Sequence, residues 1–484
     1  MPSARSLKCA VFVSTFMLAL TSAAPVAADI NEVPTPPSPT APCNAISPFA
    51  FPCSGTGKFA DAVAAECRRV GVSDNLCLVP LAHKVTQAAT AAYLQSWVHR
   101  AAQFQYALGD SVPFKDAQWI GTHNSFNSLA EQFTPSHADS NQQLSMPQQL
   151  DIDVRSIELD LHYIPRLGQL GRPGVTVCHG RPPEQGNLGC TTEPLFSKVL
   201  PVIGDWLNNH ADQVVLLLIE DQLKDPTAYA SALSTIENGL RRPDGTSLIY
   251  HPAPADISPA GCAAFPRNIS RNDVRTAGAQ VVLVSDCVPS LGSAVFSWEH
   301  EEVQKGSTFD YQQFPRCDAT YGPVVYANNI VRYFEDSTFI SALINPSRPP
   351  NNPEALTPNK VQAMTFCGVN LFGLDQLLPE DGRIQATLWS WAPDEPRAGA
   401  GGCTLQGADG RWVAAPCTDP HPAACVNGIG AWTVTAPVQF TGASAACAAL
   451  GSTFGLPRTG IQNSRLWAAA GPGGGAWVQY VISP

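Results

Sequence analysis

The sequence has few charged residues, no excess of basic residues and no cysteine pair of the CxxC type. Charged residues make up 14% of its 484 positions, and 40 Asp and Glu outnumber 29 Lys and Arg, which gives a formal net charge of −11. A chain this acidic lacks the basic surface that nucleic acids and anionic membranes attract. We therefore expect no nucleic-acid partner and no simple electrostatic adhesion to membranes.

Long apolar runs are also missing after the first 24 residues, so we expect no transmembrane anchor. The run at residues 9–24 follows two basic residues and is short for a membrane span. Val26 and Ala28 then occupy the positions that a small-residue cleavage site requires. The pattern predicts a signal peptide over residues 1–28 and a secreted or periplasmic protein, which we expect to be a monomer.

The cysteines are expected to form disulfides rather than a zinc site. One of the 15, Cys9, lies in the predicted signal peptide, which leaves an even number. Disulfides are the usual state of cysteines in an oxidising compartment. Cys178 and Cys190 lie twelve positions apart in a loop rich in Gly and Pro that directly follows an apolar run, and we predict that they pair.

Composition divides the rest of the chain into four parts. Residues 29–42 are rich in Pro, Thr and Ala and read as a linker. Residues 43–112 carry apolar side chains at helical spacing and four cysteines, which predicts a stapled helical segment. Residues 113–395 form the central domain. Residues 396–484, with more Gly, Ala and Trp and four more cysteines, form a small module that we expect to be mostly β.

The central domain alternates short apolar runs with helical patterns. The runs are QWIG, SIELDL, VTVCHG, QVVLLLIED, QVVLVSD, VNLFGLD and ATLWSW, and an amphipathic helix, LFSKVLPVIGDWLNNH, precedes the fourth. Several runs are apolar throughout, as in strands covered on both faces. This order predicts an α/β fold with a (β/α) barrel rather than an open sheet. Closure of the barrel is an inference, because eight strands cannot be counted.

Polar side chains stand at the ends of the first four runs. They are His123 and Asn124, Glu158 and Asp160, His179, and Glu220. Since parallel strands present their C-terminal ends at one face, we expect these side chains to gather there. Glu158 and Asp160 lie two apart and thus on one side of a strand. Asp221 competes with Glu220, and His162 is either a third histidine of the site or structural.

Asn, Glu and Asp supply oxygen ligands, which suit Ca²⁺ or Mg²⁺ rather than zinc. The two histidines can then act as general acid and base or stabilise charge on a phosphoryl group. The alternative interpretation of each group is structural: a turn residue for His123 and a solvated loop carboxylate for Asp160. The combination of groups favours a catalytic site.

The motifs GTHNSF, IELDLH, VCHG and VVLLLIEDQL resemble, in order and spacing, phosphatidylinositol-specific phospholipase C of the calcium-dependent type. The resemblance is strong over residues 113–225 and continues weakly to 395. It implies a distorted TIM barrel in which the inositol 2-hydroxyl attacks the neighbouring phosphorus. The implied metal is Ca²⁺, with Mg²⁺ as the less favoured ion, and the implied ligands are Asn124, Glu158, Asp160 and Glu220.

The resemblance also implies catalytic roles. His123 would stabilise the phosphorane, His179 would protonate the departing diacylglycerol oxygen, and Glu158 or another carboxylate would accept the hydroxyl proton. The expected partner is a phospholipid at a membrane surface. No Lys-rich strand matches the residues that bind phosphorylated inositol rings, so phosphatidylinositol or a glycosylated form is the expected substrate. Two alternatives stay open: a glycerophosphodiesterase or sphingomyelinase D-like enzyme, and a non-catalytic binding protein.

The C-terminal module resembles a circularly permuted C-type lectin-like domain. That resemblance implies the disulfides Cys403–Cys417 and Cys425–Cys447. Where a sugar-binding lectin has Glu-Pro-Asn, this chain has Glu395-Pro396-Arg397, so a carbohydrate partner is less expected than a stabilising or protein-binding role. Trp389 and Trp391 either stack on the head group or pack between the domains.

Overall fold

The computed structural model describes residues 87–128, 130, 140–165, 171–190, 193–298, 302–305, 314–317, 330–335, 356–379, 381–471 and 473–482. The predicted signal peptide, the linker and the part of the helical segment before residue 87 lie outside the described residues.

A mostly parallel sheet forms the centre of the molecule. From β1 (Trp119–Thr122), one side continues through β2 (Ser156–Pro165), β4 (Val215–Gln222), β6 (Val281–Ser285), β7 (Val295–Ser297) and β5 (Ala263–Ala264). The other side continues through β10 (Leu371–Leu374), β9 (Ile330–Phe334) and β8 (Glu302–Lys305). Each of these neighbours pairs in parallel.

The α/β class and the TIM-like strand order are confirmed, but the expected closed ring is not. The two edges of the strand order are β5 and β8, and no pairing joins them among the strands that the structure describes. The domain is therefore a distorted, TIM-like half-barrel. One predicted strand also has a different direction: β3 (Pro173–Val177) runs antiparallel to β2 and forms a hairpin with it.

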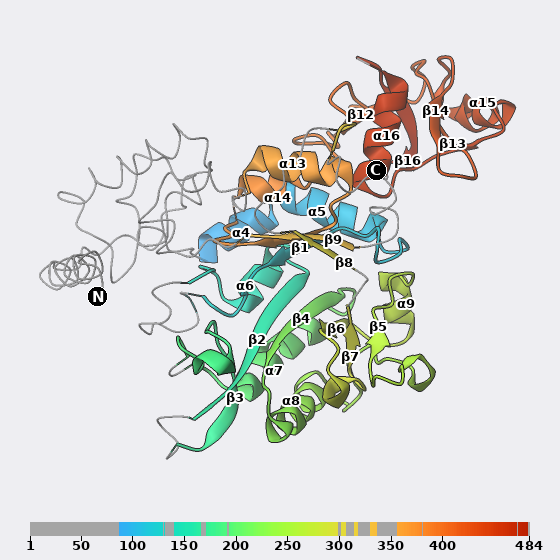
Figure 1. The fold of residues 1–484 in the computed structure, drawn as a ribbon. Helices are drawn as coiled ribbons and strands as arrows, with labels where there is room; N and C mark the ends of the chain where they lie inside the picture. Colours follow the sequence, from blue (N-terminus) through green and yellow to red (C-terminus); the bar gives the residue numbers. More distant parts are fainter. Residues whose placement is uncertain are drawn as a thin grey trace, which may run out of the picture.

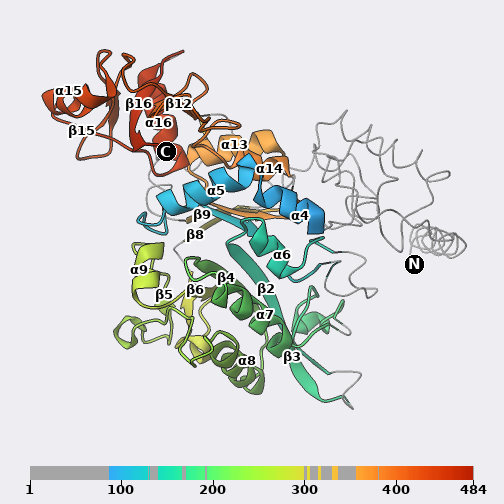
Figure 2. The same ribbon diagram turned by 180° about the vertical axis from the view of Figure 1, so that it is seen from behind.

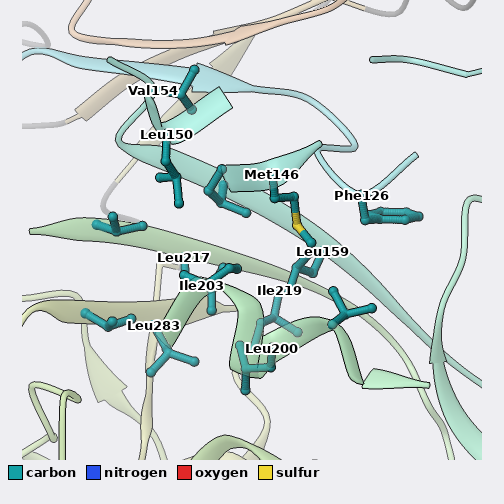
Figure 3. Packing of buried hydrophobic residues seen from close by; sticks show 14 of the residues in the cluster. Phe126, Met146, Leu150, Val154, Leu159, Leu200, Ile203, Leu217, Ile219 and Leu283 are labelled. Atoms are coloured by element: carbon teal, nitrogen blue, oxygen red, sulfur yellow. The ribbon is translucent and has the colours of Figure 1, made fainter. Parts of the chain in front are cut away.

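Helices cover the outer face of the sheet (Figure 1). They include α6 (Met146–Asp151), α7 (Phe196–Asn208), α8 (Pro226–Gly239), α13 (Pro358–Cys367) and α14 (Gly382–Ala386). A further helix, α9 (Arg271–Thr276), packs its Val274 into the second core described below. The predicted amphipathic helix is α7, and Figure 3 shows its Leu200 and Ile203 packed with Leu159, Leu217 and Ile219 of the strands. This apolar layer is the larger core of the domain.

A second core fills the inner face of the half-barrel. Trp119, Leu216, Leu218 and Leu371 lie there with Phe114 and are nearly or fully buried. These side chains occupy the N-terminal half of the strands. Further along the strands, at their C-terminal ends, the inward-facing side chains are polar. The apolar residues of this second core thus form a floor beneath a polar layer.

The N-terminal helices α4 (Gln87–Leu94) and α5 (Trp97–Leu108) pack against the domain rather than standing apart. The side chain of Gln105 on α5 donates to Thr387 O at 3.1 Å and accepts from the Trp389 N–H at 2.8 Å. The run ATLWSW, predicted as a strand, is not one. Its Ala386 ends α14, and residues 387–391 form an irregular segment with one bridge, Trp391 to Trp412.

That segment explains the two tryptophans. Trp389 and Trp391 lie in one buried cluster with Trp97 of α5 and Trp412 of the C-terminal module. The rings of Trp389 and Trp391 both meet Trp412 edge to face, with centroids 5.6 and 5.9 Å apart. Packing between the domains, and not head-group stacking, is therefore their role.

The C-terminal module consists of two three-stranded antiparallel sheets and two helices. The strands are β11 (Cys403–Gln406), β12 (Trp412–Ala415), β13 (Ala424–Val426), β14 (Trp432–Val434), β15 (Thr453–Phe454) and β16 (Ala476–Val481). The helices are α15 (Ala443–Ala449) and α16 (Gly460–Ala470). In Figures 1 and 2 the module lies beside α13 and α5, away from α7 and α8.

The predicted disulfides of the module, Cys403–Cys417 and Cys425–Cys447, are confirmed, and so is Cys178–Cys190. The described residues contain two more, Cys262–Cys287 and Cys317–Cys367. Five disulfides favour an oxidising, extracytoplasmic compartment. Lectin-like architecture stays a prediction. Within the described ranges, no helix is long and apolar enough to cross a membrane.

A buried ionic network secures the strand ends where the polar layer begins. Arg383 contacts Glu335 and, at 2.7 Å, Asp381, and all three side chains are nearly or fully buried. Glu335 in turn accepts the backbone N–H of Asp375 at 2.7 Å and of Leu356 at 2.8 Å. Burial raises the pKa of Glu335 even though Arg383 opposes the shift.

We predict that Arg383→Met lowers the free energy of unfolding by about 3–5 kcal/mol, because it leaves two carboxylates buried without their cation. Arg397→Met is the matched control: Arg397 pairs with Glu395 at 2.7 Å, but its side chain is 68% exposed. That change should cost at most about 1 kcal/mol. Denaturant unfolding measures both, and equal losses would contradict the prediction.

Candidate active site

The structure brings most of the predicted site residues to one place, the inner face at the C-terminal ends of the central strands. Glu158 and Asp160 point inward from β2, and Asp160 is in register with Glu220 on the neighbouring β4. His123 and Asn124 follow β1 directly. The side chain of Glu220 is exposed, and its Oε1 accepts from Nε2 of Gln222 at 2.8 Å.

An arginine that the sequence did not reveal enters this layer. Nη2 of Arg332 on β9 donates to Oε1 of Glu158 at 2.6 Å, although β10 and β1 lie between their strands. On these two strands the paired inner residues are Gly373 and Gly121. A Cβ on Gly121 would come within 2.8 Å of the Ser156 Cβ. The two glycines keep the crossing free of side chains.

This ion pair fixes the state of Glu158. Burial alone would raise its pKa, but the guanidinium of Arg332 and the ring of His123 outweigh burial and lower the pKa. Its second oxygen, Oε2, accepts the backbone N–H of Asn124 at 3.2 Å. Glu158 is therefore ionised and anchored at both oxygens, and it is a weak base.

His123 is held by a carboxylate that follows the neighbouring strand β10. Its Nδ1 lies 3.3 Å from Oδ1 of Asp375, which follows β10 and is fully buried. Burial alone would lower the pKa of His123, but Asp375, Glu158 and Asp160 together raise the pKa to about 10. The ring of Phe334 lies 5.2 Å away between centroids. His123 is thus a protonated imidazole at neutral pH.

Asn124 lies between His123 and Asp160. Its backbone is left-handed, with φ of 46°, which turns the side chain inward. One end of its amide lies 2.7 and 3.1 Å from the oxygens of Asp160, and the other lies 3.2 Å from Nε2 of His123. With nitrogen toward Asp160 the amide donates to it. With oxygen there, amide and carboxylate form an oxygen cluster of the kind that hard cations bind.

Asp160 lies where negative charge is disfavoured. Its side chain is buried, and burial together with Glu220 and Glu158 holds its pKa well above the usual range. The oxygen donors of this cluster fit a hard cation in their chemistry. In the present geometry, however, no group of three or more His, Cys, Asp or Glu side chains within the described residues is close enough to hold a metal ion. A metal ion bound here would require the carboxylates to move closer together.

His179 reaches the site through the β2–β3 hairpin rather than from a parallel strand. Because β3 runs back along β2, its end returns to the level of Asp160, whose carbonyl accepts the Cys178 N–H at 3.1 Å. The Cys178–Cys190 disulfide closes the following loop. The exposed ring of His179 has its Nδ1 3.4 Å from Nδ2 of Asn127.

Four residues of the site were not predicted: Arg332, Asp375, Asn127 and Asn141. Asp375 ends the predicted run VNLFGLD, so a carboxylate at a strand end was the available signal. His162 is buried and inward-facing on β2. Its Nδ1 lies 2.9 Å from Oδ1 of Asn187 in the disulfide loop, which indicates that it ties this loop to the hairpin.

The fold and the site together define the class of protein. A TIM-like α/β half-barrel carries a buried His–Asp pair, an amide and three carboxylates at its C-terminal strand ends, with a second histidine returned by a hairpin. Residues 78–381 match the family model described as the Rv2075c PI-PLC-like domain. The chain belongs to this family.

Two relatives align with the whole chain. One is "Uncharacterized protein Rv2075c" of Mycobacterium tuberculosis strain ATCC 25618 / H37Rv, which is 63% identical over 487 residues, with full coverage of both chains. The other is "Uncharacterized protein MT2135" of strain CDC 1551 / Oshkosh, with the same identity and coverage.

Solved structures are more distant. The phosphatidylinositol-specific phospholipase C of Listeria monocytogenes matches with a TM-score of 0.38 and 16% identity, over 60% of this chain and 97% of that one. A Staphylococcus aureus phosphatidylinositol-specific phospholipase C matches with a TM-score of 0.39 and 10% identity, over 60% and 99%.

We predict that Asp375→Asn lowers the pKa of His123 from about 10 toward its ordinary 6.5. Since the folded pKa is raised, the pair stabilises the folded protein fully below about pH 6.5, and this contribution is lost as pH rises through about 10. Histidine NMR titration in chelator, with unfolding measured across the same range, tests both points. A wild-type His123 that titrates near 6.5 would contradict the assignment.

Proposed function

We propose that this protein is a calcium-dependent phosphodiesterase that cleaves phosphatidylinositol, or a glycosylated form, by attack of the inositol 2-hydroxyl on phosphorus. The products are diacylglycerol and inositol cyclic phosphate, which can be hydrolysed further. One observation carries the proposal: the protonated His123–Asp375 pair lies directly beside the oxygen ligands of Asn124 and Asp160, in a chain of the PI-PLC-like family. An imidazolium next to a hard-cation site suits a phosphodiester anion.

The metal would be held by Asn124, Glu158, Asp160 and Glu220. When bound, Ca²⁺ lowers the pKa of the attacking hydroxyl and neutralises phosphate charge. The raised pKa of Asp160 supports this assignment, and so does the position of the Asn124 amide, which lies 2.7 Å from an oxygen of that carboxylate. Carboxylate and amide oxygens favour Ca²⁺ over zinc, and Mg²⁺ is the second choice.

The side chains divide the remaining work. His123 binds a phosphoryl oxygen and stabilises the charge that develops there, since Asp375 keeps its ring protonated. Asp160 is better suited than Glu158 to accept the hydroxyl proton, because the ion pair with Arg332 lowers the pKa of Glu158. His179, in the exposed loop, delivers a proton to the departing alkoxide and later takes one from water.

The partner that follows from this chemistry is a phospholipid at a membrane surface. The site lies at the open ends of the strands, and Leu188, in the same disulfide-closed loop as His179, is 74% exposed. The C-terminal module packs against α5 and α13 through the tryptophan cluster, so we assign it a stabilising role, with a protein or carbohydrate partner as a secondary one.

A lipid-release assay with calcium or EGTA tests the proposal. Phosphatidylinositol should be cleaved only with calcium, whereas sphingomyelin and glycerophosphocholine should not be cleaved. Asp160→Asn should lose calcium activation, and calcium should raise the melting temperature of the wild type but not of this variant. Cleavage of glycerophosphocholine or sphingomyelin instead would favour the other phosphodiesterases, and no cleavage together with intact calcium binding would favour a binding protein.

We predict that His179→Ala slows cleavage of natural lipid by about 10²–10⁴, the usual value of a general acid. A nitrophenyl phosphodiester of inositol has an acidic leaving group and needs little protonation, so it should be affected far less. His123→Ala should damage both substrates alike, because charge develops on phosphorus whatever leaves.

Asn124→Ala is the control for metal binding, and added calcium should partly restore its activity. Neither histidine variant should respond to calcium in this way. Equal losses of His179→Ala on both substrates would show that another group is the acid, even if the enzyme is a phospholipase.

A further inference from the structure

A continuous path of hydrogen bonds joins the two histidines through buried side chains. Nδ1 of His123 lies 3.3 Å from Oδ1 of Asp375, and that oxygen accepts from Nδ2 of Asn141 at 3.3 Å. Oδ1 of Asn141 accepts from Nδ2 of Asn127 at 2.8 Å, and that nitrogen lies 3.4 Å from Nδ1 of His179. Asp375 and Asn141 are fully buried, and Asn127 is 5% exposed.

The backbone holds the two amides in this arrangement. The N–H groups of Asn141 and Gln142 both donate to the carbonyl of Asn127, at 3.0 and 2.9 Å. The carbonyl of Asn141 accepts from the N–H of Gln376, the residue after Asp375, at 2.7 Å. Both the backbone N–H and the backbone carbonyl of Asn141 are therefore hydrogen-bonded, which fixes its place in the path.

The path has a direction because an ionised carboxylate can only accept hydrogen bonds. Asp375 requires the nitrogen of the Asn141 amide, which turns the oxygen of that amide to Asn127. Asn127 must then present its nitrogen, and the same nitrogen faces His179. A neutral imidazole has one donor and one acceptor nitrogen, so Nδ1 of His179 is left as the acceptor.

We propose that Asn127 and Asn141 are positioning residues that form a directional relay. While Asp375 is ionised, the relay holds Nδ1 of His179 as an acceptor and places the proton of the neutral ring on Nε2. A carboxylate that does not touch His179 thus decides its tautomer through two amides. The catalytic meaning of the relay rests on the function proposed above, but the tautomer itself does not.

For catalysis, the relay opposes formation of the acid. An imidazolium carries protons on both nitrogens, and the proton on Nδ1 would face the amide nitrogen of Asn127. Asn127 must therefore rotate, offer its oxygen to the ring and give up its 2.8 Å bond to Asn141. The proton that then leaves Nε2 goes to the alkoxide oxygen as its bond to phosphorus breaks.

The tautomer can be measured directly in full-length protein labelled with ¹⁵N-histidine, in chelator, with His179→Gln identifying the resonances. Long-range ¹H–¹⁵N spectra should show the Nε2–H pattern for wild-type His179. Asn141→Leu and Asn127→Leu should each shift it toward a mixture of both tautomers. The decisive variant is Asn141→Leu. Within the relay Asn141 contacts Asn127 and Asp375, so its effect on the tautomer of His179 must pass through Asn127.

Gln142→Leu is the matched control. Gln142 is also buried and also donates to Oδ1 of Asp375, at 3.4 Å, but its other bonds lead to the carbonyls of His123 and Leu374. Its loss should leave the tautomer of His179 unchanged. Melting curves establish that each variant is folded. An Nδ1–H wild type, or an Asn141→Leu protein that keeps the wild-type pattern, would overturn the relay.

Turnover of phosphatidylinositol provides a second test with opposite expectations for the two amides. Asn127→Leu removes the oxygen that would receive the Nδ1 proton, whereas Asn141→Leu frees Asn127 to rotate. The kcat of Asn141→Leu should therefore exceed that of Asn127→Leu by about tenfold, the effect of about one hydrogen bond, with similar KM. Equal values would overturn this consequence. A wild type that is inactive on every lipid but has the expected tautomer would refute the proposed function and leave the relay intact.

Discussion

Buried negative charge is the constraint on which the site depends. Glu158, Asp160 and Asp375 are all buried on or beside the inner face of the half-barrel, where an uncompensated carboxylate costs several kcal/mol. Arg332 compensates Glu158, and His123 compensates Asp375. Asp160 lies near the amide of Asn124, but burial and the like charges of Glu220 and Glu158 outweigh the attraction of His123 and Arg332. Two of the three charges are balanced within the chain.

The fold meets this constraint by bringing distant segments together at one edge. Arg332 reaches Glu158 across two strands because both intervening inner positions are glycine. Below them, the apolar floor around Trp119 keeps water away, which strengthens each ion pair. The β2–β3 hairpin then returns His179 to the level of Asp160 without a further parallel strand.

The sequence predicted the parts of this arrangement that are local. The pattern of β2 showed that Glu158 and Asp160 share a face, and a short loop predicted the Cys178–Cys190 pair. Direction was not readable, because an apolar run looks alike in parallel and antiparallel strands, so β3 was misassigned. Arg332 was missed since its partner lies 174 positions away and only the strand order joins them. ATLWSW was mistaken for a strand because residues buried between domains and residues in a strand are equally apolar.

The charge that remains unbalanced links stability to function. Burial and like charge raise the pKa of Asp160, so this carboxylate destabilises the folded chain at neutral pH. The folded chain must either ionise the buried group or keep it protonated, and each costs free energy that the unfolded chain does not lose. A cation at the same place would remove that penalty, so the free energy lost in the metal-free protein becomes affinity for the metal. In the same way, the carboxylate of Asp375 stabilises the protonated ring of His123. The site is therefore suited to an anionic phosphodiester. Asp375 keeps the positive charge of His123 in place, and a cation bound at Asp160 would neutralise the negative charge of that carboxylate.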